Sequence, residues 1–159
     1  HYILDENADN ICDNCGKELY VERTLDDNNT VVSTVAEIPS DAKMITSDTE
    51  ILESGWYVVE GNVNVSGQIE VKGIPDKPTR IILKDGCYFR VDRGIILNDG
   101  KELIVYGQRG ENGTLFVNPG VDGPGIGGSY GAISGNVTFC GGNVVANGGE
   151  YVKSRFIKS

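Results

Sequence analysis

The chain has 159 residues, 23 of them acidic and 14 basic, and a formal net charge of −9, so its length suits one ordinary domain or a small domain with an appendage. A net-acidic surface gains no counterion release from a nucleic-acid backbone, so we expect no DNA or RNA binding. No apolar run approaches the ~18 residues that a membrane span requires, and we expect no membrane insertion within this chain.

The 22 glycines divide the sequence into two unequal parts. Only Gly16 lies in the first 54 residues, and the other 21 glycines lie from Gly55 onward. Glycine costs about 1 kcal/mol against alanine inside a helix, which excludes a helical bundle for the later part. No G-X-Y period runs through it, which excludes collagen. The charge divides near the same place, because residues 1–60 carry 14 acidic side chains and 3 basic ones.

The first two segments of the chain are polar and irregular. Residues 1–20 form an acidic loop module that holds a C-x-x-C pair. Residues 21–54 contain two turn-rich stretches, at 24–29 and 38–43, around short apolar pieces without a helical period. We interpret residues 21–54 as an extended linker that pairs locally, or as an N-terminal cap. Because the sequence begins at His1, with neither an initiator Met nor a signal peptide, we interpret it as a fragment or a mature chain.

From Gly55 onward, short alternating runs follow one another. Glycines recur every six residues at first, and apolar and polar residues alternate between them, which is typical of half-buried strands. The predicted strands are Trp56–Glu60, Asn62–Ser66, Gln68–Lys72, Thr79–Leu83, Cys87–Val91, Ile95–Leu97, Glu102–Tyr106, Thr114–Val117, Asn136–Phe139, Asn143–Ala146 and Tyr151–Ile157. A sandwich or barrel uses longer strands and wider turn spacing. We therefore predict an all-β fold, a short right-handed parallel β-helix of about four coils over residues 55–159, with Tyr151–Ile157 as a candidate cap.

Residues 45–148 resemble a known repeat domain. The resemblance rests on six motifs in order: residues 54–63 (SGWYVVEGNV), 82–86 (ILKDG), 103–108 (LIVYGQ), 113–115 (GTL), 125–128 (GIGG) and 135–138 (GNVT). The family is a glycine-rich β-helical repeat of large surface and secreted proteins of Gram-positive gut anaerobes, often labelled carbohydrate-binding. After Gly149 the chain departs from the family's usual order, because Tyr151–Ile157 follows where the family repeats its Gly-Ile-Gly-Gly coil. The resemblance implies a bacterial, extracellular or cell-surface location.

The first 20 residues resemble a second module of such proteins, a short His-led acidic loop that ends in a cysteine pair. The matching residues are His1, Asp5, Asn7, Asp9, Cys12, Asp13, Cys15 and Gly16. The resemblance implies an extracellular spacer or a small metal-stabilised knuckle without catalysis.

The cysteines leave several states open. Cys12 and Cys15, together with His1, are three ligands suited to structural zinc, which needs four nitrogen or sulfur donors or a carboxylate in the fourth place. A local disulfide and two free thiols are the alternatives. A thioredoxin-like role is disfavoured because no βαβ pattern surrounds the pair. Cys87 and Cys140 sit singly in strand-like runs, where an isolated cysteine is commonly a small buried apolar residue.

Two further motifs copy ligand-binding loops incompletely. Asp5, Asn7 and Asp9 reproduce the first half of a calcium loop, although the usual turn glycine and bidentate Glu are missing. A solvated acidic loop is the alternative. The stretch Gly123–Gly128 satisfies G-x-G-x-x-G, but the next residues are too rich in glycine to begin the helix that a dinucleotide site needs. We interpret it as a glycine-rich corner.

Catalysis has little support in the sequence. The single histidine is His1, so no Ser-His or Cys-His pair can form within residues 55–159. Aromatic side chains could instead line a flat wall and contact sugar rings, with core packing as the alternative. The predicted ligand-binding residues are Trp56, Tyr57, Tyr88, Tyr106 and Tyr130, and Phe116 and Phe139 are further aromatics in strands. Trp56 is the best candidate for an exposed platform, since Tyr57 must point to the opposite face.

We therefore expect a non-catalytic structural or adhesive module. A carbohydrate-binding module that recognises polysaccharide is the second hypothesis, and a β-helical polysaccharide lyase or hydrolase is the third. The expected partners are glycans or host and cell-wall surface components. The only cofactors that the sequence suggests are structural zinc or calcium in residues 1–20.

Overall fold

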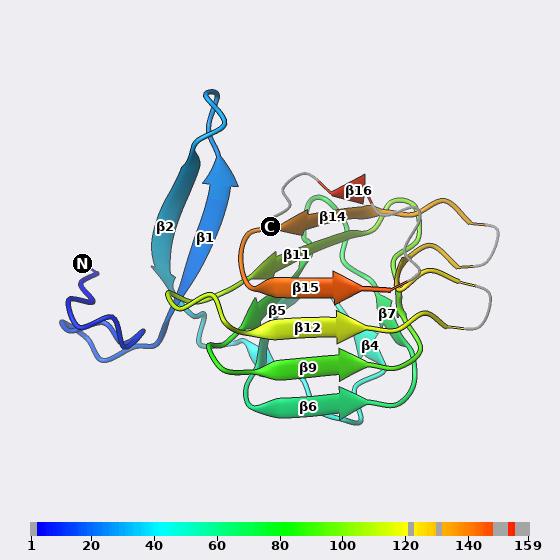
Figure 1. The fold of residues 1–159 in the computed structure, drawn as a ribbon, viewed down its shortest axis with the longest axis horizontal. Helices are drawn as coiled ribbons and strands as arrows, with labels where there is room; N and C mark the ends of the chain where they lie inside the picture. Colours follow the sequence, from blue (N-terminus) through cyan, green and yellow to red (C-terminus); the bar gives the residue numbers. More distant parts are fainter. Residues whose placement is uncertain (1–2, 121–122, 130–131, 148–152, 155–159) are drawn as a thin grey trace.

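A computed structural model describes residues 3–120, 123–129, 132–147 and 153–154 (Figure 1). This part of the chain contains sixteen strands and no helix, which confirms the all-β class. Fourteen of the strands belong to three parallel sheets, and the other two form an antiparallel hairpin. Residues 1–2, 121–122, 130–131, 148–152 and 155–159 lie outside the description.

The parallel strands are short and fall into three sheets, each named here after its strand in the first complete round. The β5 sheet contains β3 (Lys43–Met44), β5 (Gly55–Val59), β8 (Thr79–Leu83), β11 (Glu102–Tyr106), β14 (Asn136–Phe139) and β16 (Lys153–Ser154). The β6 sheet contains β6 (Asn62–Val65), β9 (Tyr88–Val91), β12 (Thr114–Val117) and β15 (Asn143–Ala146). The β7 sheet contains β4 (Ile51–Leu52), β7 (Ile69–Val71), β10 (Ile95–Ile96) and β13 (Ile126–Gly127).

Each of these strands from β4 to β12 pairs in parallel with the strand three places later in the chain. In the β5 sheet, Tyr57 lies opposite Ile81, which lies opposite Val105. In the β6 sheet, Val65 lies opposite Val91, which lies opposite Val117. The chain therefore visits the three sheets in turn, and similar residues align from one round to the next. The expected strands from residue 56 to residue 146 are present, with shifts of at most one residue at their ends.

The inward side chains of the three sheets form one apolar core. The side chains of Ile69 and Ile95 from the β7 sheet, Phe89 from the β6 sheet and Ile81 from the β5 sheet have no exposed surface. Burying one side chain of this kind contributes about 1.5–3 kcal/mol. The alternation of apolar and polar residues along the strands therefore predicts which side chains point into this core.

Glycine conformation explains the sharp corners between the β5 and β6 sheets. Gly61, between β5 and β6, has φ of 67°, and Gly86, at the equivalent corner one round later, has φ of 81°. Residues with a Cβ rarely adopt this left-handed backbone region. A hydrogen bond also joins the two successive corners, because the Tyr88 amide donates to the Gly61 carbonyl.

The hairpin of β1 (Leu19–Leu25) and β2 (Val31–Glu37) projects from the body, as Figure 1 shows. Its base covers the outer face of the β5 sheet, where Val58, Ile82, Tyr106 and Cys140 form a second buried cluster. Tyr20, Ile38 and Ala42 pack against that cluster from the N-terminal side. The local pairing expected in residues 21–54 is therefore this hairpin, and β3 and β4 add two further short strands to the sheets.

The described segments before the hairpin and after β15 contain little regular structure. Residues 3–18 form an irregular loop with one antiparallel bridge between Ile11 and Glu18. Of the run Tyr151–Ile157, only Lys153–Ser154 is described, and it pairs in parallel with β14. The other residues of that candidate cap lie outside the described residues.

Candidate functional site

An aromatic group lies on the outer face of the β5 sheet, around Trp56. The ring of Trp56 is stacked on that of Tyr106 at 5.3 Å between centroids, and Tyr20 from β1 lies 5.1 Å from both rings. The guanidinium of Arg80, on the neighbouring strand, lies 5.2 Å from the Trp56 centroid and donates a hydrogen bond to the Tyr106 hydroxyl. Burial raises the pKa values of Tyr20 and Tyr106, so both hydroxyls stay protonated at neutral pH.

Trp56 also lines a cleft of about 480 Å³ between the start of β5 and the loop before β8. The other lining side chains include both charge signs: Asp41 and Lys43 before β5, Asp76 and Lys77 in the loop, and Arg80 on β8. An aromatic wall beside charged hydrogen-bonding groups suits a polar ligand with apolar ring faces.

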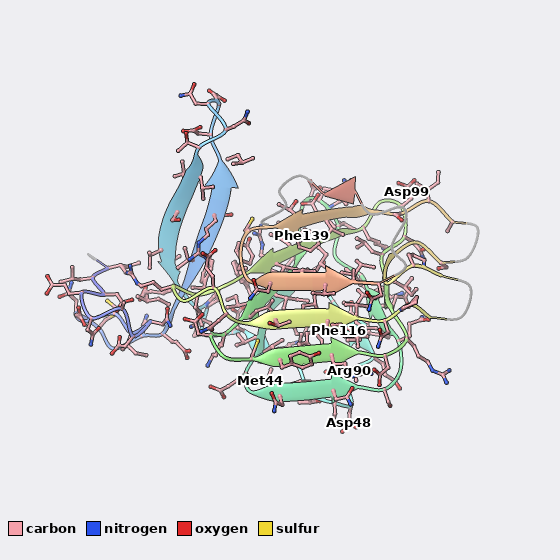
Figure 2. All side chains as sticks on the ribbon, in the orientation of Figure 1. Met44, Asp48, Arg90, Asp99, Phe116 and Phe139 are labelled. Atoms are coloured by element: carbon pink, nitrogen blue, oxygen red, sulfur yellow. The ribbon has the colours of Figure 1, made fainter. Side chains whose placement is uncertain are left out.

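A second aromatic surface lies on the outer face of the β6 sheet. Tyr88 on β9 is 41% exposed and stacks on Phe116 of β12 at 6.3 Å between centroids. Arg90 lies 5.8 Å from the Phe116 centroid and pairs with Asp92 at 2.6 Å. Figure 2 shows Arg90 and Phe116 on the same broad face of neighbouring strands. The predicted ligand set did not include Phe116, because only the parallel register brings it beside Tyr88.

The other predicted ligand residues occupy different places. Tyr57 is 7% exposed, and its hydroxyl accepts a hydrogen bond from the Glu53 amide at 3.0 Å. Tyr106 is 1% exposed, so neither ring offers a face to solvent. Tyr130 lies outside the described residues. Trp56 does point away from Tyr57, as the alternation predicts, but it is half-buried beneath Tyr20 and Arg80 and is not an open platform.

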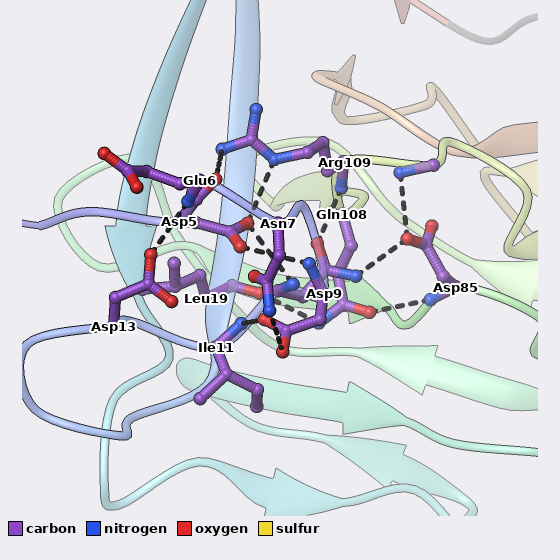
Figure 3. Close-up of polar contacts among 12 residues, drawn as sticks. Asp5, Glu6, Asn7, Asp9, Ile11, Asp13, Leu19, Asp85, Gln108 and Arg109 are labelled. Atoms are coloured by element: carbon purple, nitrogen blue, oxygen red, sulfur yellow. Dashed lines mark hydrogen bonds and ion pairs between the residues drawn. The ribbon is translucent and has the colours of Figure 1, made fainter.

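The N-terminal loop is held to the body by a polar network centred on Asp5 and Arg109 (Figure 3). The Asp5 carboxylate accepts hydrogen bonds from the amides of Asp9 and Asn10 and from Arg109 Nε at 3.0 Å. Its side chain is 2% exposed. Burial alone would raise the pKa of Asp5, but the hydrogen bonds from Arg109 and the two amides outweigh it and lower the pKa.

The same network reaches the corner that precedes β9. The Asn10 side chain donates to Asp85 at 2.9 Å and accepts from the Arg109 amide at 3.0 Å. Gln108 accepts from the Asp85 amide and donates to the Leu19 carbonyl. The loop, the hairpin and two corners of the body are therefore joined by hydrogen bonds.

Two residues of the predicted calcium loop, Asp5 and Asp9, use their carboxylate oxygens as acceptors within this network, and Asn7 donates through its side-chain nitrogen. Asp9 accepts from the Asn7 side chain at 3.0 Å and from the Ile11 amide at 2.9 Å, while Asp5 faces Arg109. Among the described residues, no group of three or more His, Cys, Asp and Glu side chains is arranged to hold a metal ion. The calcium assignment stays a prediction from the sequence alone.

Cys12 and Cys15 are free thiols in contact with each other. Cys12 is buried, and hydrogen bonds from the amides of Leu4, Asn14 and Cys15 and from the Cys15 thiol lower its pKa despite burial. Cys15 is exposed; the Lys17 amide lowers its pKa, but the neighbouring Cys12 and burial outweigh that and raise it overall. His1 lies outside the described residues, so the zinc set also stays a prediction.

Cys87 and Cys140 behave as the isolated cysteines were expected to behave. Both are 2% exposed, Cys87 in the core and Cys140 beneath the hairpin. Burial raises the pKa of Cys87 to about 11 and that of Cys140 to about 12. These thiols are protonated at neutral pH, and such thiols are poor nucleophiles.

The glycine-rich stretch Gly123–Gly128 contributes a strand and no helix. It contains β13, which pairs with β10 through Ile126 and Gly127. The described residues after it, 129 and 132–135, are not helical. A dinucleotide site needs a helix that begins directly after the glycines, and these described residues form none.

No family model, curated protein or solved structure matches the chain. The resemblance to glycine-rich β-helical repeats therefore stays a prediction. In the described part of the chain, no helix is long and apolar enough to cross a membrane.

Proposed function

We propose that the chain is a non-catalytic structural or adhesive module of a bacterial cell-surface or secreted protein. In this proposal the three parallel sheets are the sides of a short right-handed parallel β-helix of about four coils. The observation that carries the proposal is the register, in which each strand from β4 to β12 pairs with the strand three places later around one apolar core. Stacked coils contact only their neighbours and make a rigid spacer.

Cross-linking across one round tests the proposed coil. Thr114 and Asn143 face outward on β12 and β15 and are direct partners. Parallel neighbours lie about 4.8 Å apart, within the ~4.4–6.8 Å that a disulfide accepts between Cα atoms. In a Cys15→Ser background, Thr114→Cys with Asn143→Cys should oxidise to an intramolecular disulfide. Asn62→Cys with Asn143→Cys is the control, since two strands separate these residues, and a disulfide there would contradict the coil.

An activity screen separates this proposal from the polysaccharide lyase or hydrolase hypothesis. Incubation with uronic-acid polymers should release neither unsaturated products nor new reducing ends. Asp85 and Arg90, charged groups that a lyase could use, already bond to Gly110 and Asp92 respectively. Turnover that disappears in Arg90→Ala would overturn the non-catalytic assignment.

Carbohydrate binding at the Trp56 cleft is the second candidate function. The observation that favours it is the combination of one aromatic wall with Asp76, Lys77 and Arg80 in a single hollow of about 480 Å³. Sugars present apolar ring faces and hydroxyl groups together, and such a lining can contact both. Asp76 and Lys77 are exposed and take no part in the aromatic stack, so they can be changed without disturbing it.

A glycan array with three variants tests that candidate. Binding should weaken in Trp56→Ala and in Asp76→Ala with Lys77→Ala, and should be unchanged in Tyr88→Ala, which lies on a different sheet. The Asp76→Ala with Lys77→Ala variant leaves the aromatic stack intact. It therefore tests the cleft even if Trp56→Ala loosens the packing of Tyr20. Loss of binding in Tyr88→Ala alone would move the site to the β6 sheet, and no binding to any glycan would leave only the structural role.

A further inference from the structure

The outer edge of β2 is the longest open strand edge on the N-terminal side of the molecule. Among the described residues, β2 pairs only with β1, over the seven residues Val31–Glu37. The hairpin also projects beyond the body, so this edge stands clear of the three parallel sheets (Figure 1). An uncovered edge presents a row of amides and carbonyls to which another strand can pair.

The hydrogen-bond pattern identifies which groups of β2 are open. The Ile38 amide donates to the Glu18 carbonyl, and the Asp26 amide donates to the Thr30 carbonyl. Bonded and non-bonded pairs alternate in an antiparallel ladder, so the even-numbered residues of β2 bond to β1. The odd-numbered residues, from Val31 through Ser33 and Val35, therefore direct their amides and carbonyls outward.

The matching groups of β1 are already used. By the same alternation, the odd-numbered residues of β1 face away from β2. Their amides donate to the body and to the loop: Leu19 to the Asn10 carbonyl, Val21 to the Gly107 carbonyl and Arg23 to the Cys140 carbonyl. One edge of the hairpin is thus docked and the other is open.

The side chains beside the open edge favour pairing. Residues 31–34 are all exposed, with Val31 at 54% and Val32 at 43%. Strand edges that avoid pairing usually carry lysine, proline or a bulge. The stretch 31–36 has no charge and no proline, and all seven residues of β2 pair with β1 in continuous register.

Charge indicates what kind of strand the edge accepts. Asp26 and Asp27 are exposed at the hairpin tip, and Glu22 is half-exposed on β1. The one basic residue of the hairpin, Arg23, is buried and paired with Glu111 at 3.0 Å. A chain with a net charge of −9 also repels a second copy of itself. We propose that the β2 edge binds an extended, basic polypeptide segment by strand addition, with backbone hydrogen bonds supplying affinity and lysine or arginine side chains meeting the acidic tip.

A fluorescently labelled probe peptide tests the proposal on the full chain. The probe has nine residues and alternates lysine with valine and threonine, and a matched peptide carries glutamate in place of lysine. The basic peptide should bind at least 10-fold more tightly than the acidic one, and its affinity should fall as salt increases. A basic peptide with alternate amides N-methylated keeps its charge but cannot add as a strand, and it should bind at least 10-fold more weakly.

Ser33→Pro is the decisive variant. It removes an outward amide while leaving the even-numbered bonds to β1 in place, and proline is tolerated at such edge positions. The basic peptide should bind this variant at least 10-fold more weakly. Ser47→Pro is the matched control, placed at the second position of the Thr46–Thr49 turn, where proline suits the backbone.

Three outcomes would overturn the inference. Full binding to Ser33→Pro, with the hairpin amides still protected from hydrogen exchange, would place the peptide elsewhere. If the acidic peptide or the N-methylated peptide binds as tightly as the basic peptide, charge-guided strand addition is excluded. Dimerisation of the peptide-free chain in sedimentation, abolished by Ser33→Pro, would show that the edge instead pairs with a second copy.

Discussion

The N-terminal loop and the stacked body are stabilised by different forces. The loop meets the body through charged and amide side chains, such as Asp5 with Arg109 and Asn10 with Asp85. The body encloses a core of aliphatic side chains and Phe89 with almost no exposed surface. Charged contacts weaken when a partner is protonated or when salt screens them, whereas apolar burial does not depend on charge. The difference predicts that the loop can be released while the body stays folded.

Truncating the core should have the largest effect. Phe89 has no exposed surface and belongs to the main core cluster. Phe89→Ala should lower the free energy of unfolding by about 3–5 kcal/mol, measured by urea denaturation. Met44→Ala, at a side chain that is 50% exposed, is the control and should change it by less than about 0.5 kcal/mol. Equal effects of the two variants would argue against a packed core.

Removing the Asp5 carboxylate should weaken the loop and leave the body intact. Asp5→Ala leaves Arg109 Nε and the amides of Asp9 and Asn10 without their carboxylate acceptor. Loss of these bonds should cost about 1–2 kcal/mol of docking free energy. Hydrogen exchange should then be faster in residues 3–18 and unchanged in β8 and β11. Faster exchange in those strands as well would show that the loop and the body unfold together.

Acid should release the same loop by a smaller and gradual effect. The native pKa of Asp5 lies below its ordinary value of 3.8 because its hydrogen bonds favour the charged form. The contribution of the Asp5 carboxylate to the docking of the loop is therefore complete above that ordinary pKa. It is lost as the pH falls through the lowered native pKa. Limited proteolysis of residues 3–18 should accelerate between pH 5 and about pH 2. Asp5→Asn should cleave quickly at both pH values, and persistent pH dependence in that variant would implicate another group.

Removing the surface ion pair of Lys17 and Glu37 should have the smallest effect on the free energy of unfolding. Its atoms are 3.6 Å apart, and the Lys17 side chain is 64% exposed. Lys17→Ala should change the free energy of unfolding by less than about 0.5 kcal/mol at moderate salt, as exposed pairs usually do. A loss above 1 kcal/mol in urea denaturation would indicate that this pair helps to hold the hairpin to the loop.

The body was predictable from the sequence because its pattern is local. The alternation of Val63 and Val65 with asparagines, and the glycine corners at Gly61 and Gly86, depend only on neighbouring residues. The parallel register could only be suggested, since nothing local sets which strand pairs with which. The pairing of Tyr88 with Phe116 was missed for that reason.

The covering of Trp56 could not be predicted. Alternation correctly placed it opposite Tyr57, but Tyr20, which lies 36 positions earlier, packs against its ring. The docking of the loop could not be predicted from the sequence either. Asp5 and Arg109 are 104 positions apart and belong to segments without a repeating pattern. Contacts between charged side chains at such separations leave no periodic signal in a single sequence.

The unequal lengths of the rounds show where the body accepts extra sequence. Thr79 and its partner Leu103 are 24 positions apart, whereas Leu103 and its partner Val137 are 34 positions apart. The strands pair in register in both rounds, so the additional chain between β12 and β14 leaves the ladder undisturbed. Loop closure entropy grows slowly with length. The two connections on either side of β13 are therefore the natural places to graft an epitope or tag, and the places where related sequences would vary in length at the least cost in stability.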